Sequence, residues 1–454
     1  MNQRSILIAG MGQGGMVAAI KLGEAGYKVD VFEKAAKGKV SYDWTDDMVK
    51  KPFETLGIPL PPKESYSQMN SWYWVTPDGK TRIQFPANGV GNDISVERHD
   101  LCDHFAALAE ATGNVTIHYE ETVKELILEK DMVVGFTTDK GTYKGDLVID
   151  ACGIHSPLRR QIPDKFMIQV APAADDNMLA YRAFYEMNPD YDAPVYPQAR
   201  SCMYLKHMGG AGLSWCNLSP HNEVDIFIGR IGGLTKEEAD EMEADLFEKH
   251  ADMLTHNVVY PGKWVSVNTR YTISRMVADG YALVGESAFM SIPIMGSGIE
   301  SAMNAGVLLA DAIIDAGDAK LDAKHLWPYQ VAFYKKLGAI FALIDVLKRW
   351  VLNIDGEVAD WALGHVAGPQ CIEPLTFFLL NEMSLVKMLS KFIPNVVKAV
   401  PKLFERPAVI RELLGVVGHG IKAFLVALTL PKKYKQRKVD RWTRRYEACF
   451  PHEK

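Results

Sequence analysis

The chain has 454 residues, of which 48% are apolar and 23% are charged, a composition typical of a soluble protein with more than one core. Its net charge of −6 argues against nucleic acid as the main partner. The charge is uneven, because residues 401–454 carry 13 lysines and arginines against 5 acidic residues. This basic end indicates contact with an anionic membrane surface or an acidic protein, or only a solvated terminus that aids solubility.

The six cysteines stand alone, without a CxxC pair that would indicate a zinc or iron–sulfur site. We therefore expect no metal, no disulfide and a reducing, cytoplasmic location. Glycines interrupt the first apolar run too early for the core of a signal peptide. That run is instead predicted to be a buried strand.

The chain begins with a βαβ pattern. "SILIAG" predicts a strand, "GGMVAAIKLGEAG" a helix and "YKVDVFEK" a second strand. The loop between the first two has G-x-G-x-x-G spacing at Gly10, Gly12 and Gly15. These glycines are suited to a tight turn, to close approach of a phosphate and to helix–strand packing, respectively. The pattern predicts a Rossmann-type site in which the helix N-terminus binds a pyrophosphate.

An acidic residue, Glu33, follows the second strand. A carboxylate there can accept hydrogen bonds from both ribose hydroxyls and would repel a 2′-phosphate, so NADP is not expected at this site. We assign Gly14 and Lys34 to the same site. This first loop alone does not distinguish NAD from FAD.

The middle of the chain is rich in strand patterns. "NSWYWV" and "TRIQF" flank "TPDGK" and predict a hairpin. The helix "RHDLCDHFAALAEAT" and a strand meander follow, and the helix "TKEEADEMEADLFEKH" opens with capping-box spacing at Thr235 and Glu238. From about residue 319 the pattern is helical, and no apolar run is long enough to span a membrane. These helices are expected to form a cap over the core, a homodimer face or a membrane-surface patch, with packing favoured.

A second glycine loop lies some 270 residues after the first, in "GYALVGESAFMSIPIMGSGIESAMNAG". It resembles the C-terminal flavin motif of the two-domain FAD enzymes with the p-hydroxybenzoate hydroxylase fold. The resemblance implies that Glu286, where the family usually has Asp, contacts the ribityl chain. It also implies that a helix N-terminus faces the flavin ring, where backbone N–H groups stabilise negative charge. The residues concerned are Pro293, Gly296, Ser297, Gly298 and Ile299. One loop would then hold the ADP end of FAD and the other the ribityl chain and ring.

A third motif, "VIDACGIHSPLRRQI", resembles the internal fingerprint of the same fold. Gly153, Ser156 and Arg159 match it, whereas Cys152 replaces an aspartate, which weakens an NADPH-dependent hydroxylase interpretation. Cys152 is expected to be a small buried residue without redox chemistry. Arg98 matches a family arginine near the flavin phosphates and ribityl chain, and an ordinary surface arginine is the alternative.

A fourth motif, "GGAGLSWCNLSPHNEVDIFIG", resembles the geranylgeranyl reductase family. Trp215 matches a tryptophan that lines the lipid cavity of those enzymes, with a core tryptophan as the alternative. The tyrosine and phenylalanine positions of the family hold Leu213 and either Asn217 or Leu218, so the pocket lining differs. The resemblance covers about residues 1–320.

Further aromatic residues are candidates for the substrate site. Tyr42 and Trp44 in "VSYDWTDD" are placed to wall it, and Tyr42 is a candidate proton donor. Strand alternation puts Trp72 and Trp74 on one face. We select Tyr42 and Trp215 as catalytic candidates and Trp44, Trp74 and Trp215 as substrate contacts, with packing as the alternative for each.

Together these patterns predict an α/β flavoprotein with three parts. The expected divisions are a Rossmann-type FAD-binding domain of residues 1–165 and 276–318, an inserted mixed-sheet substrate domain of residues 166–275 with the hairpin 69–90, and a helical region of residues 319–454. The expected reaction is reduction of a carbon–carbon double bond in an apolar isoprenoid or lipid-like substrate, with NAD(P)H or a redox protein as electron donor. The alternatives are an FAD-dependent monooxygenase and, from another class, a membrane-associated flavin-binding protein without turnover.

Overall fold

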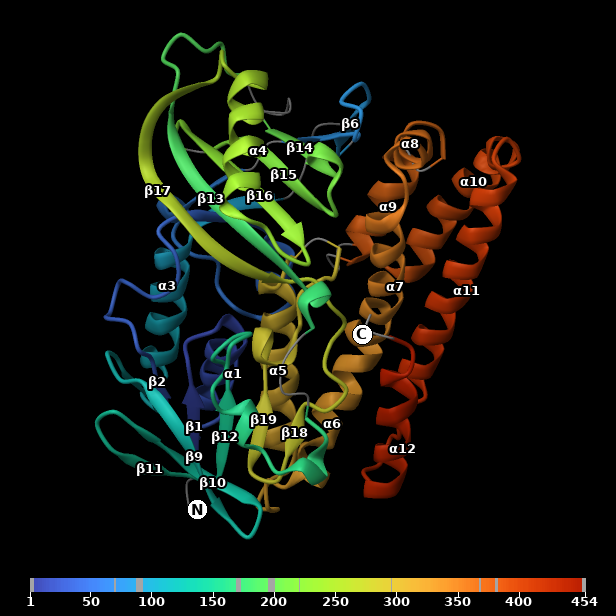
Figure 1. The fold of residues 1–454 in the computed structure, drawn as a ribbon. Helices are drawn as coiled ribbons and strands as arrows, with labels where there is room; N and C mark the ends of the chain where they lie inside the picture. The colour runs from blue at the N-terminus through green and yellow to red at the C-terminus, as the bar shows by residue number, and fades with distance from the viewer. Residues whose placement is uncertain are drawn as a thin grey trace.

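The computed structural model describes residues 4–68, 71–86, 93–168, 173–194, 201–219, 221–294, 296–366, 369–379 and 383–450. Two large sheets lie one above the other, and a column of helices runs along one side of both (Figure 1). The four sheets follow from the pairing of strands that are often far apart in the sequence.

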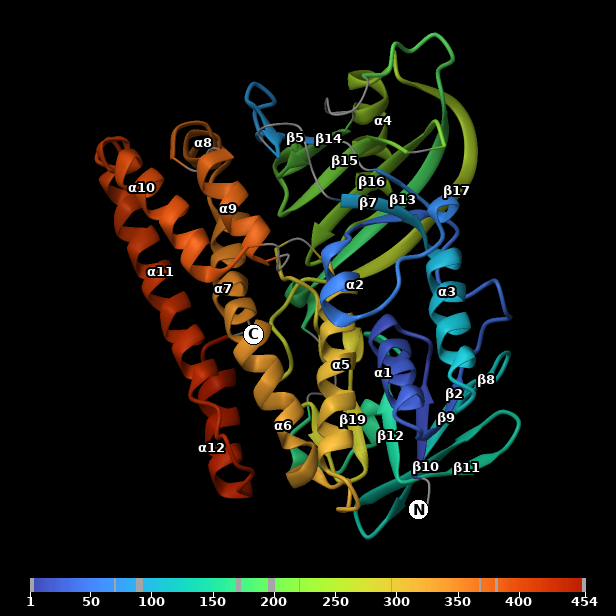
Figure 2. The ribbon, with the colours of Figure 1, turned by 180° about the vertical axis from the view of Figure 1, so that it is seen from behind.

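The lower sheet carries the predicted βαβ unit. Its six strands have the order β18-β19-β12-β1-β2-β8 and are parallel except for β18. Three helices, α1, α3 and α5, accompany it, and α1 and α5 pack side by side (Figure 2). A small antiparallel sheet, β11-β10-β9, lies beside it. The bounds are β1 (Ser5–Ala9), α1 (Gln13–Glu24), β2 (Lys28–Phe32), α3 (Arg98–Ala111), β8 (Val115–His118), β9 (Val123–Glu129), β10 (Met132–Thr138), β11 (Thr142–Lys144), β12 (Leu147–Asp150), β18 (Val277–Ala278), β19 (Tyr281–Leu283) and α5 (Ile299–Asp315).

The upper sheet has seven strands in the order β17-β13-β16-β15-β14-β5-β6. The predicted hairpin supplies β5 and β6, although residues 69–70 and 87–90 of its predicted range lie outside the described residues. Helix α4 covers one face and buries Ala239, Met242 and Leu246 against it, and its predicted capping box is present. The bounds are β5 (Trp72–Val75), β6 (Arg82–Phe85), β13 (Asn177–Met187), β14 (Ser201–Leu205), β15 (Gly212–Leu218), β16 (Glu223–Ile231), α4 (Lys236–Lys249) and β17 (Leu254–Asn268).

A fourth sheet, which the sequence patterns do not predict, connects the two layers. Strands β3 (Thr45–Val49), β7 (Asp93–Glu97) and β4 (Tyr66–Gln68) pair antiparallel, and the short helix α2 (Lys51–Leu56) follows β3. Val49 at the end of β3 donates its N–H to the Glu300 carboxylate at the start of α5. This contact fixes the β3-β7-β4 sheet against the lower sheet.

The C-terminal region is helical, as predicted. Its helices are α6 (Ala323–Phe333), α7 (Ala339–Asn353), α8 (Gly356–Trp361), α9 (Pro369–Leu379), α10 (Leu385–Leu403), α11 (Pro407–Leu428) and α12 (Gln436–Glu447). Trp327, Phe341, Trp442 and Tyr446 are buried in the same continuous core as strand β1. The helices are therefore part of the main body. None of the helices in the described part of the chain combines the length and apolar composition needed to span a bilayer.

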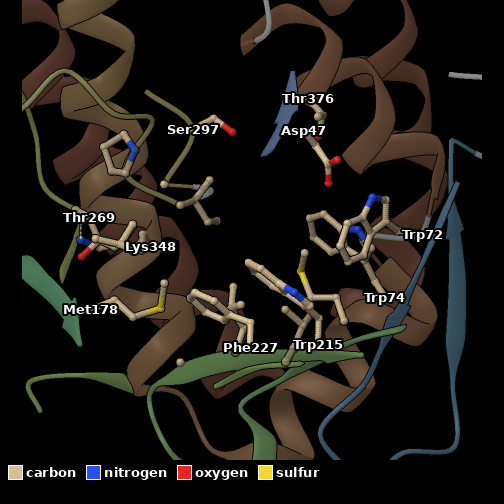
Figure 3. Close-up of a pocket in the computed structure, with 18 of the residues that line it drawn as sticks. Asp47, Trp72, Trp74, Met178, Trp215, Phe227, Thr269, Ser297, Lys348 and Thr376 are labelled. Carbon is tan, nitrogen blue, oxygen red and sulfur yellow. Dashed lines mark hydrogen bonds between the residues drawn. The ribbon is translucent and has the colours of Figure 1, made fainter. Parts of the chain in front are cut away.

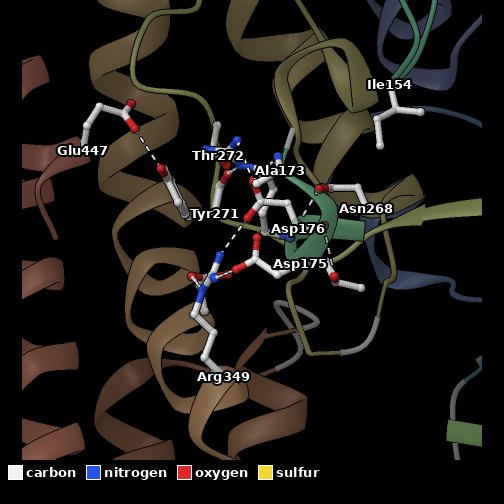
Figure 4. A network of polar contacts seen from close by, with 12 residues as sticks. Ile154, Ala173, Asp175, Asp176, Asn268, Tyr271, Thr272, Arg349 and Glu447 are labelled. Carbon is white, nitrogen blue, oxygen red and sulfur yellow. Dashed lines mark hydrogen bonds and ion pairs between the residues drawn. The ribbon is translucent and has the colours of Figure 1, made fainter. Parts of the chain in front are cut away.

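A buried ionic cluster fixes α7 to the connection before β13 (Figure 4). The Arg349 guanidinium contacts Asp175 at 2.5 Å, Asp176 at 2.7 Å and Asp345 at 2.8 Å. The Arg270 guanidinium lies 3.1 Å from Asp176, which is fully buried. Opposite charges that are removed from water must pair in this way, because an unpaired one is costly.

Candidate active site

The first glycine loop packs against the end of β12. Gly10 has a φ of +85°, and a Cβ on Gly10 or Gly12 would lie 2.7 or 2.8 Å from the Ala151 carbonyl oxygen. A Cβ on Gly15 would lie 2.6 Å from the Ala151 Cβ. Only glycine lets the loop pass so close to β12 and lets α1 begin there. The first N–H groups of α1 have no intrahelical acceptor and are directed toward this loop.

The two glycine loops are neighbours because their helices are in contact. A Cβ on Gly14 would lie 2.8 Å from the Ala302 carbonyl oxygen, and one on Gly306 would lie 2.3 Å from the Gly14 carbonyl oxygen. Gly14 therefore permits α1 to pack on α5. The N-termini of both helices consequently belong to one region of the molecule.

The acid predicted to follow β2 lies at the first loop. Glu33 is 8% exposed, and its carboxylate accepts hydrogen bonds from the N–H groups of Met11, at 3.0 Å, and Ala35, at 2.9 Å. Lys34 is exposed beside it. The geometry fixes the Glu33 carboxylate at the edge of the loop.

A buried aspartate, Asp150, links the third motif to the second loop. It accepts hydrogen bonds from the hydroxyls of Ser156, Tyr281 at 2.5 Å and Ser287 at 2.9 Å. The Arg159 guanidinium donates to the Ser287 carbonyl oxygen at 2.8 Å. The sequence interpretation missed Asp150, although an aspartate that ends a buried parallel strand was a visible signal.

Cys152 and Gly153, which follow this aspartate in the chain, were both singled out in the third motif. Burial raises the pKa of the Cys152 thiol well above its usual range, and the thiol contacts the Ala9 carbonyl oxygen at 3.3 Å. Such a thiol is unreactive, which agrees with a packing role. Gly153 has a φ of +81°, and no atom lies within 4 Å of where its Cβ would be.

The second loop turns tightly between β19 and α5. Burial raises the pKa of the Glu286 carboxyl to about 7, against the hydrogen bond from the Ser291 hydroxyl, which lowers it. Gly296 has a φ of +70°, and Gly298 caps α5 with no room for a side chain, because its Cβ would lie 2.6 Å from the Ser291 hydroxyl. The loop residues Pro293, Gly296, Ser297, Gly298 and Ile299 line a cavity.

Arg98 begins α3 and is 8% exposed. Its guanidinium Nε lies 3.2 Å from the Ser41 hydroxyl and 3.5 Å from the Asp46 carboxylate. The alternative of an ordinary surface arginine is therefore wrong. The side chain joins α3 to the segment that enters β3.

The cavity has a volume of about 550 Å³ and extends from the second loop across the upper sheet to the C-terminal helices (Figure 3). Its floor is a row of side chains on the face of the sheet opposite α4. Because paired residues on neighbouring strands share a face, the register places Trp74, Met203, Trp215 and Phe227 in one line across four strands. The sequence thus supplies a large apolar surface beside the second loop.

Trp215 is held by both stacking and hydrogen bonding. Its ring stacks on Phe227 at 3.8 Å, and its indole N–H donates to the Asp225 carboxylate at 2.9 Å. The same carboxylate forms an ion pair with Arg182, whose guanidinium also lies over the Trp44 ring. Aromatic side chains fixed in this way give the cavity a rigid wall.

The other predicted aromatic residues also border the cavity. Trp72, Trp74, Trp44 and Tyr42 line it, and Tyr42 stacks on Trp44 at 4.5 Å. Trp72 meets Trp215 edge to face at 5.9 Å. Tyr42 is 40% exposed, and burial of the rest of its ring raises the pKa of its phenol.

The remaining wall comes from the C-terminal helices, which the sequence analysis did not connect to the site. The cavity-lining residues there are Lys348, Val351, Leu352, Ala359, Leu363, Leu375 and Thr376. Lys348 is 2% exposed, donates to the Thr269 carbonyl oxygen and pairs with Asp345 at 3.0 Å. Within the described ranges, no three His, Cys, Asp or Glu side chains are grouped as metal ligands would be.

The chain is similar in sequence to curated reductases over most of its length. It is 24% identical to digeranylgeranylglycerophospholipid reductase from Sulfolobus acidocaldarius, covering 79% of each chain. It is 26% identical to digeranylgeranylglycerophospholipid reductase 2 from Methanococcoides burtonii, covering 78% of this chain and 85% of that protein. An FAD-dependent monooxygenase of an Aspergillus species is 27% identical over 42% of this chain. No protein-family model matches the chain.

The fold is similar to that of a geranylgeranyl bacteriochlorophyll reductase-like protein from Thermoplasma acidophilum. The TM-score is 0.72 at 20% identity, over 91% of this chain and 99% of that one. This coverage must include part of the helical region, because residues 1–320 make up a smaller share of the 454. The expectation that the similarity ends near residue 320 is therefore wrong.

The fold, the two adjoining helix N-termini and these relatives define an FAD-dependent oxidoreductase. Within that class, the relatives named above include curated digeranylgeranylglycerophospholipid reductases, in agreement with the resemblance of the motifs to the geranylgeranyl reductase family. The residues present fit FAD, because the two loops lie side by side, no atom lies within 4 Å of where a Cβ on Gly153 would be, and no side chain caps the N-terminus of α5.

Proposed function

We propose that the protein reduces a carbon–carbon double bond in an apolar isoprenoid or lipid-like substrate. The observation that carries this proposal is the tryptophan-lined cavity of about 550 Å³, which begins at the second glycine loop. Pockets of this size accept a small organic ligand, and an apolar wall favours a hydrocarbon chain.

FAD supplies a hydride from its N5 atom when it is bound. The groups that would hold the ADP end are the first loop, with Gly10, Gly12, Gly14 and Gly15, together with Glu33, Lys34, Arg98 and Gly153. The groups that would hold the ribityl chain and ring are Glu286, Pro293, Gly296, Ser297, Gly298 and Ile299. The division into an FAD domain of residues 1–165 and 276–318, a substrate domain of residues 166–275 with hairpin 69–90, and a helical region of residues 319–454 belongs to the same proposal.

The aromatic wall positions the substrate chain. Trp44, Trp74 and Trp215 line the cavity, and Arg182 with Asp225 holds Trp215 in place. Removing the chain from water provides the binding energy, roughly 0.8 kcal/mol for each buried methylene. The C-terminal helices add a further apolar wall to the cavity through Val351, Leu352 and Leu375.

The reaction also needs a reductant, which we expect to be NAD(P)H or a reduced redox protein. The test mixes anaerobically reduced holoprotein with an unsaturated isoprenoid phospholipid and follows reoxidation of the flavin absorbance. Mass spectrometry of the lipid should show the gain of two hydrogens for each reduced double bond. Uptake of ¹⁸O from labelled oxygen would instead identify a monooxygenase. Flavin that neither reoxidises with any unsaturated lipid nor transfers oxygen would identify a binding protein without turnover.

An exposed apolar stripe on α10 supports contact with an anionic membrane. Its members are 37 to 79% exposed and recur at helical spacing, on α10 at Val386, Leu389, Ile393, Val397 and Val400 and at its C-cap Phe404. The helix carries four exposed lysines and no acidic residue. Apolar and cationic groups on one helix are typical of binding at a lipid surface.

The test is flotation with vesicles of phosphatidylglycerol or of phosphatidylcholine. An Ile393→Ser/Val397→Ser variant should lose binding to the anionic vesicles, whereas Leu128→Ser, an exposed residue on β9, should not. Sedimentation without vesicles tests whether the stripe instead binds a second copy of the chain. A dimer that the double variant abolishes would assign it to a second copy of the chain.

A further inference from the structure

Asp47 places a carboxyl group in the wall of the tryptophan-lined cavity (Figure 3). It lies in β3, opposite Ser95 of β7, and two residues before Val49, which contacts the start of α5. Trp72 and Trp74 line the same cavity. The carboxyl is therefore inside the site and near the loop that would face the flavin ring.

Asp47 differs from its neighbours Asp46 and Asp225 in having no ionic partner. Asp46 pairs with Arg182 at 2.9 Å, and Asp225 pairs with the same guanidinium at 2.9 Å. Within the described part of the chain, no lysine, arginine or histidine forms an ion pair with Asp47, and its hydrogen-bond partner is the Ser95 hydroxyl. Asp47 is half-buried in the cavity wall, and a carboxyl there without a cation partner retains its proton more readily than its paired neighbours.

The electrostatics agree with this geometry. Burial raises the pKa of Asp47 to about 7, the hydrogen bond from Ser95 opposes the rise, and the negative charge of Asp46 adds to it. Arg182 acts in the opposite direction, and Asp225 in the same direction as Asp46. The other charged or titratable groups that line the cavity are Tyr42, Lys206, Glu300 and Lys348. An acid with this pKa exists in both protonation states near neutral pH, as a general acid must.

The alternatives to Asp47 are less suited to donate a proton to the substrate. The Lys348 ammonium is committed to the Thr269 carbonyl oxygen and to Asp345. The Glu286 carboxyl accepts a hydrogen bond from Ser291 and does not line the cavity. Tyr42 borders the cavity but is 40% exposed.

We propose that Asp47 is the general acid that protonates the substrate double bond, an inference that rests on the proposed function. FAD, when bound and reduced by NAD(P)H or a redox protein, would supply the hydride that one alkene carbon accepts. The π bond breaks, and its electron pair takes the proton of Asp47 at the other carbon. The O–H bond of Asp47 breaks, a C–H bond forms, and the carboxylate left behind is reprotonated from water. The product would have gained two hydrogens, with reduced FAD as the two-electron donor and Asp47 as the proton donor.

The first measurement does not depend on turnover. Infrared difference spectra of the FAD-loaded protein, recorded between pH 5 and 9, should show a protonated carboxyl band that titrates near pH 7. Asp47→Asn should remove the part of this band that does not come from Glu286, whose pKa is also about 7. Asp43→Asn is the matched control, because Asp43 lies on the same segment, is 45% exposed and does not line the cavity. A band that persists unchanged in Asp47→Asn would show that the titrating acid is another residue.

The second measurement is single-turnover reduction of an unsaturated isoprenoid phospholipid by protein whose flavin has been reduced beforehand. Asp47→Asn should slow reduction by about 100-fold, a typical loss for a general acid. Its FAD content and its rate of flavin reduction by the donor should match those of Asp43→Asn. Asp47→Glu should recover part of the rate, which also controls for misfolding of the asparagine variant.

The outcomes separate this inference from the function on which it rests. If wild type and Asp43→Asn reduce the lipid and Asp47→Asn does so at an undiminished rate, Asp47 is not the acid and the proposed function stands. If wild type reduces no alkene while its carboxyl titrates near pH 7, the proposed function fails, and with it the role of Asp47.

Discussion

Replacing Arg349 with glutamine should weaken the attachment of the C-terminal helices to the rest of the fold. In Arg349→Gln, the Asp176 and Asp345 carboxylates lose a charged partner while remaining 0% exposed. Breaking a buried ion pair from one side costs about 3–5 kcal/mol. Because the Arg349 side chain is itself 22% exposed, and because Arg270 and Lys348 still contact the two carboxylates, we expect the lower figure, about 3 kcal/mol.

The assay is urea unfolding of the FAD-loaded protein, followed by circular dichroism, with the free energy taken by linear extrapolation. The matched control is Arg406→Gln, which breaks an equally short pair with Glu357, a side chain that is 78% exposed. An exposed pair contributes at most about 1 kcal/mol. If Arg349→Gln and Arg406→Gln destabilise the protein equally, the buried cluster does not hold α7 and the reasoning is refuted.

Three further changes test the site. Gly298→Val places a Cβ 2.6 Å from the Ser291 hydroxyl and 3.1 Å from the Glu286 carboxylate, so FAD affinity should fall at least about 10-fold in a fluorescence titration of the apoprotein. Trp215→Leu removes the stacked ring over Phe227 and should weaken binding of an isoprenoid lipid about 10-fold by calorimetry, with FAD content unchanged. Asp47 has a folded-state pKa above its unfolded value, so its contribution to stability is complete below about pH 4 and is lost as the pH rises through about 7. Urea unfolding should therefore show wild type losing about 1–4 kcal/mol relative to Asp47→Asn between pH 4 and pH 9.

The parts of the fold that could be predicted are those that local sequence encodes. The first strand, loop and helix follow from a short apolar run that ends at glycine, and the structure has them at Ser5–Ala9 and Gln13–Glu24. The capping box at Thr235 is likewise a pattern within four residues. The two tryptophans of β5 share a face because side chains alternate along any strand.

The parts that could not be predicted depend on contacts between distant segments. The strand Thr45–Val49 begins with three polar residues and has no pattern that predicts a strand, and it exists because residues 93–97 pair with it. The raised pKa of Asp47 depends on that pairing, which places Ser95 opposite it, and on charged groups from the upper sheet, Arg182 and Asp225. No local sequence pattern reveals these contacts. The helical wall could not be assigned either, since an apolar helix face is compatible with a core, an interface or a cavity.

The C-terminal helices line the cavity on one side and expose the apolar stripe of α10 on the other. This arrangement bears on how a substrate reaches the cavity. Helices α7 and α9 line the cavity through Leu352 and Leu375, and α10 packs against α9. The exposed stripe of α10 therefore lies one helix away from the cavity wall. If α10 lies on a membrane as proposed, α9 is the element between the bilayer and the cavity, and a lipid chain has the shortest path past it. Enlarging the cavity at Leu375 by substitution with alanine should then speed lipid reduction in vesicles more than reduction of the same lipid in detergent micelles, because only the vesicle reaction depends on that path. Equal effects in both would place the entrance elsewhere.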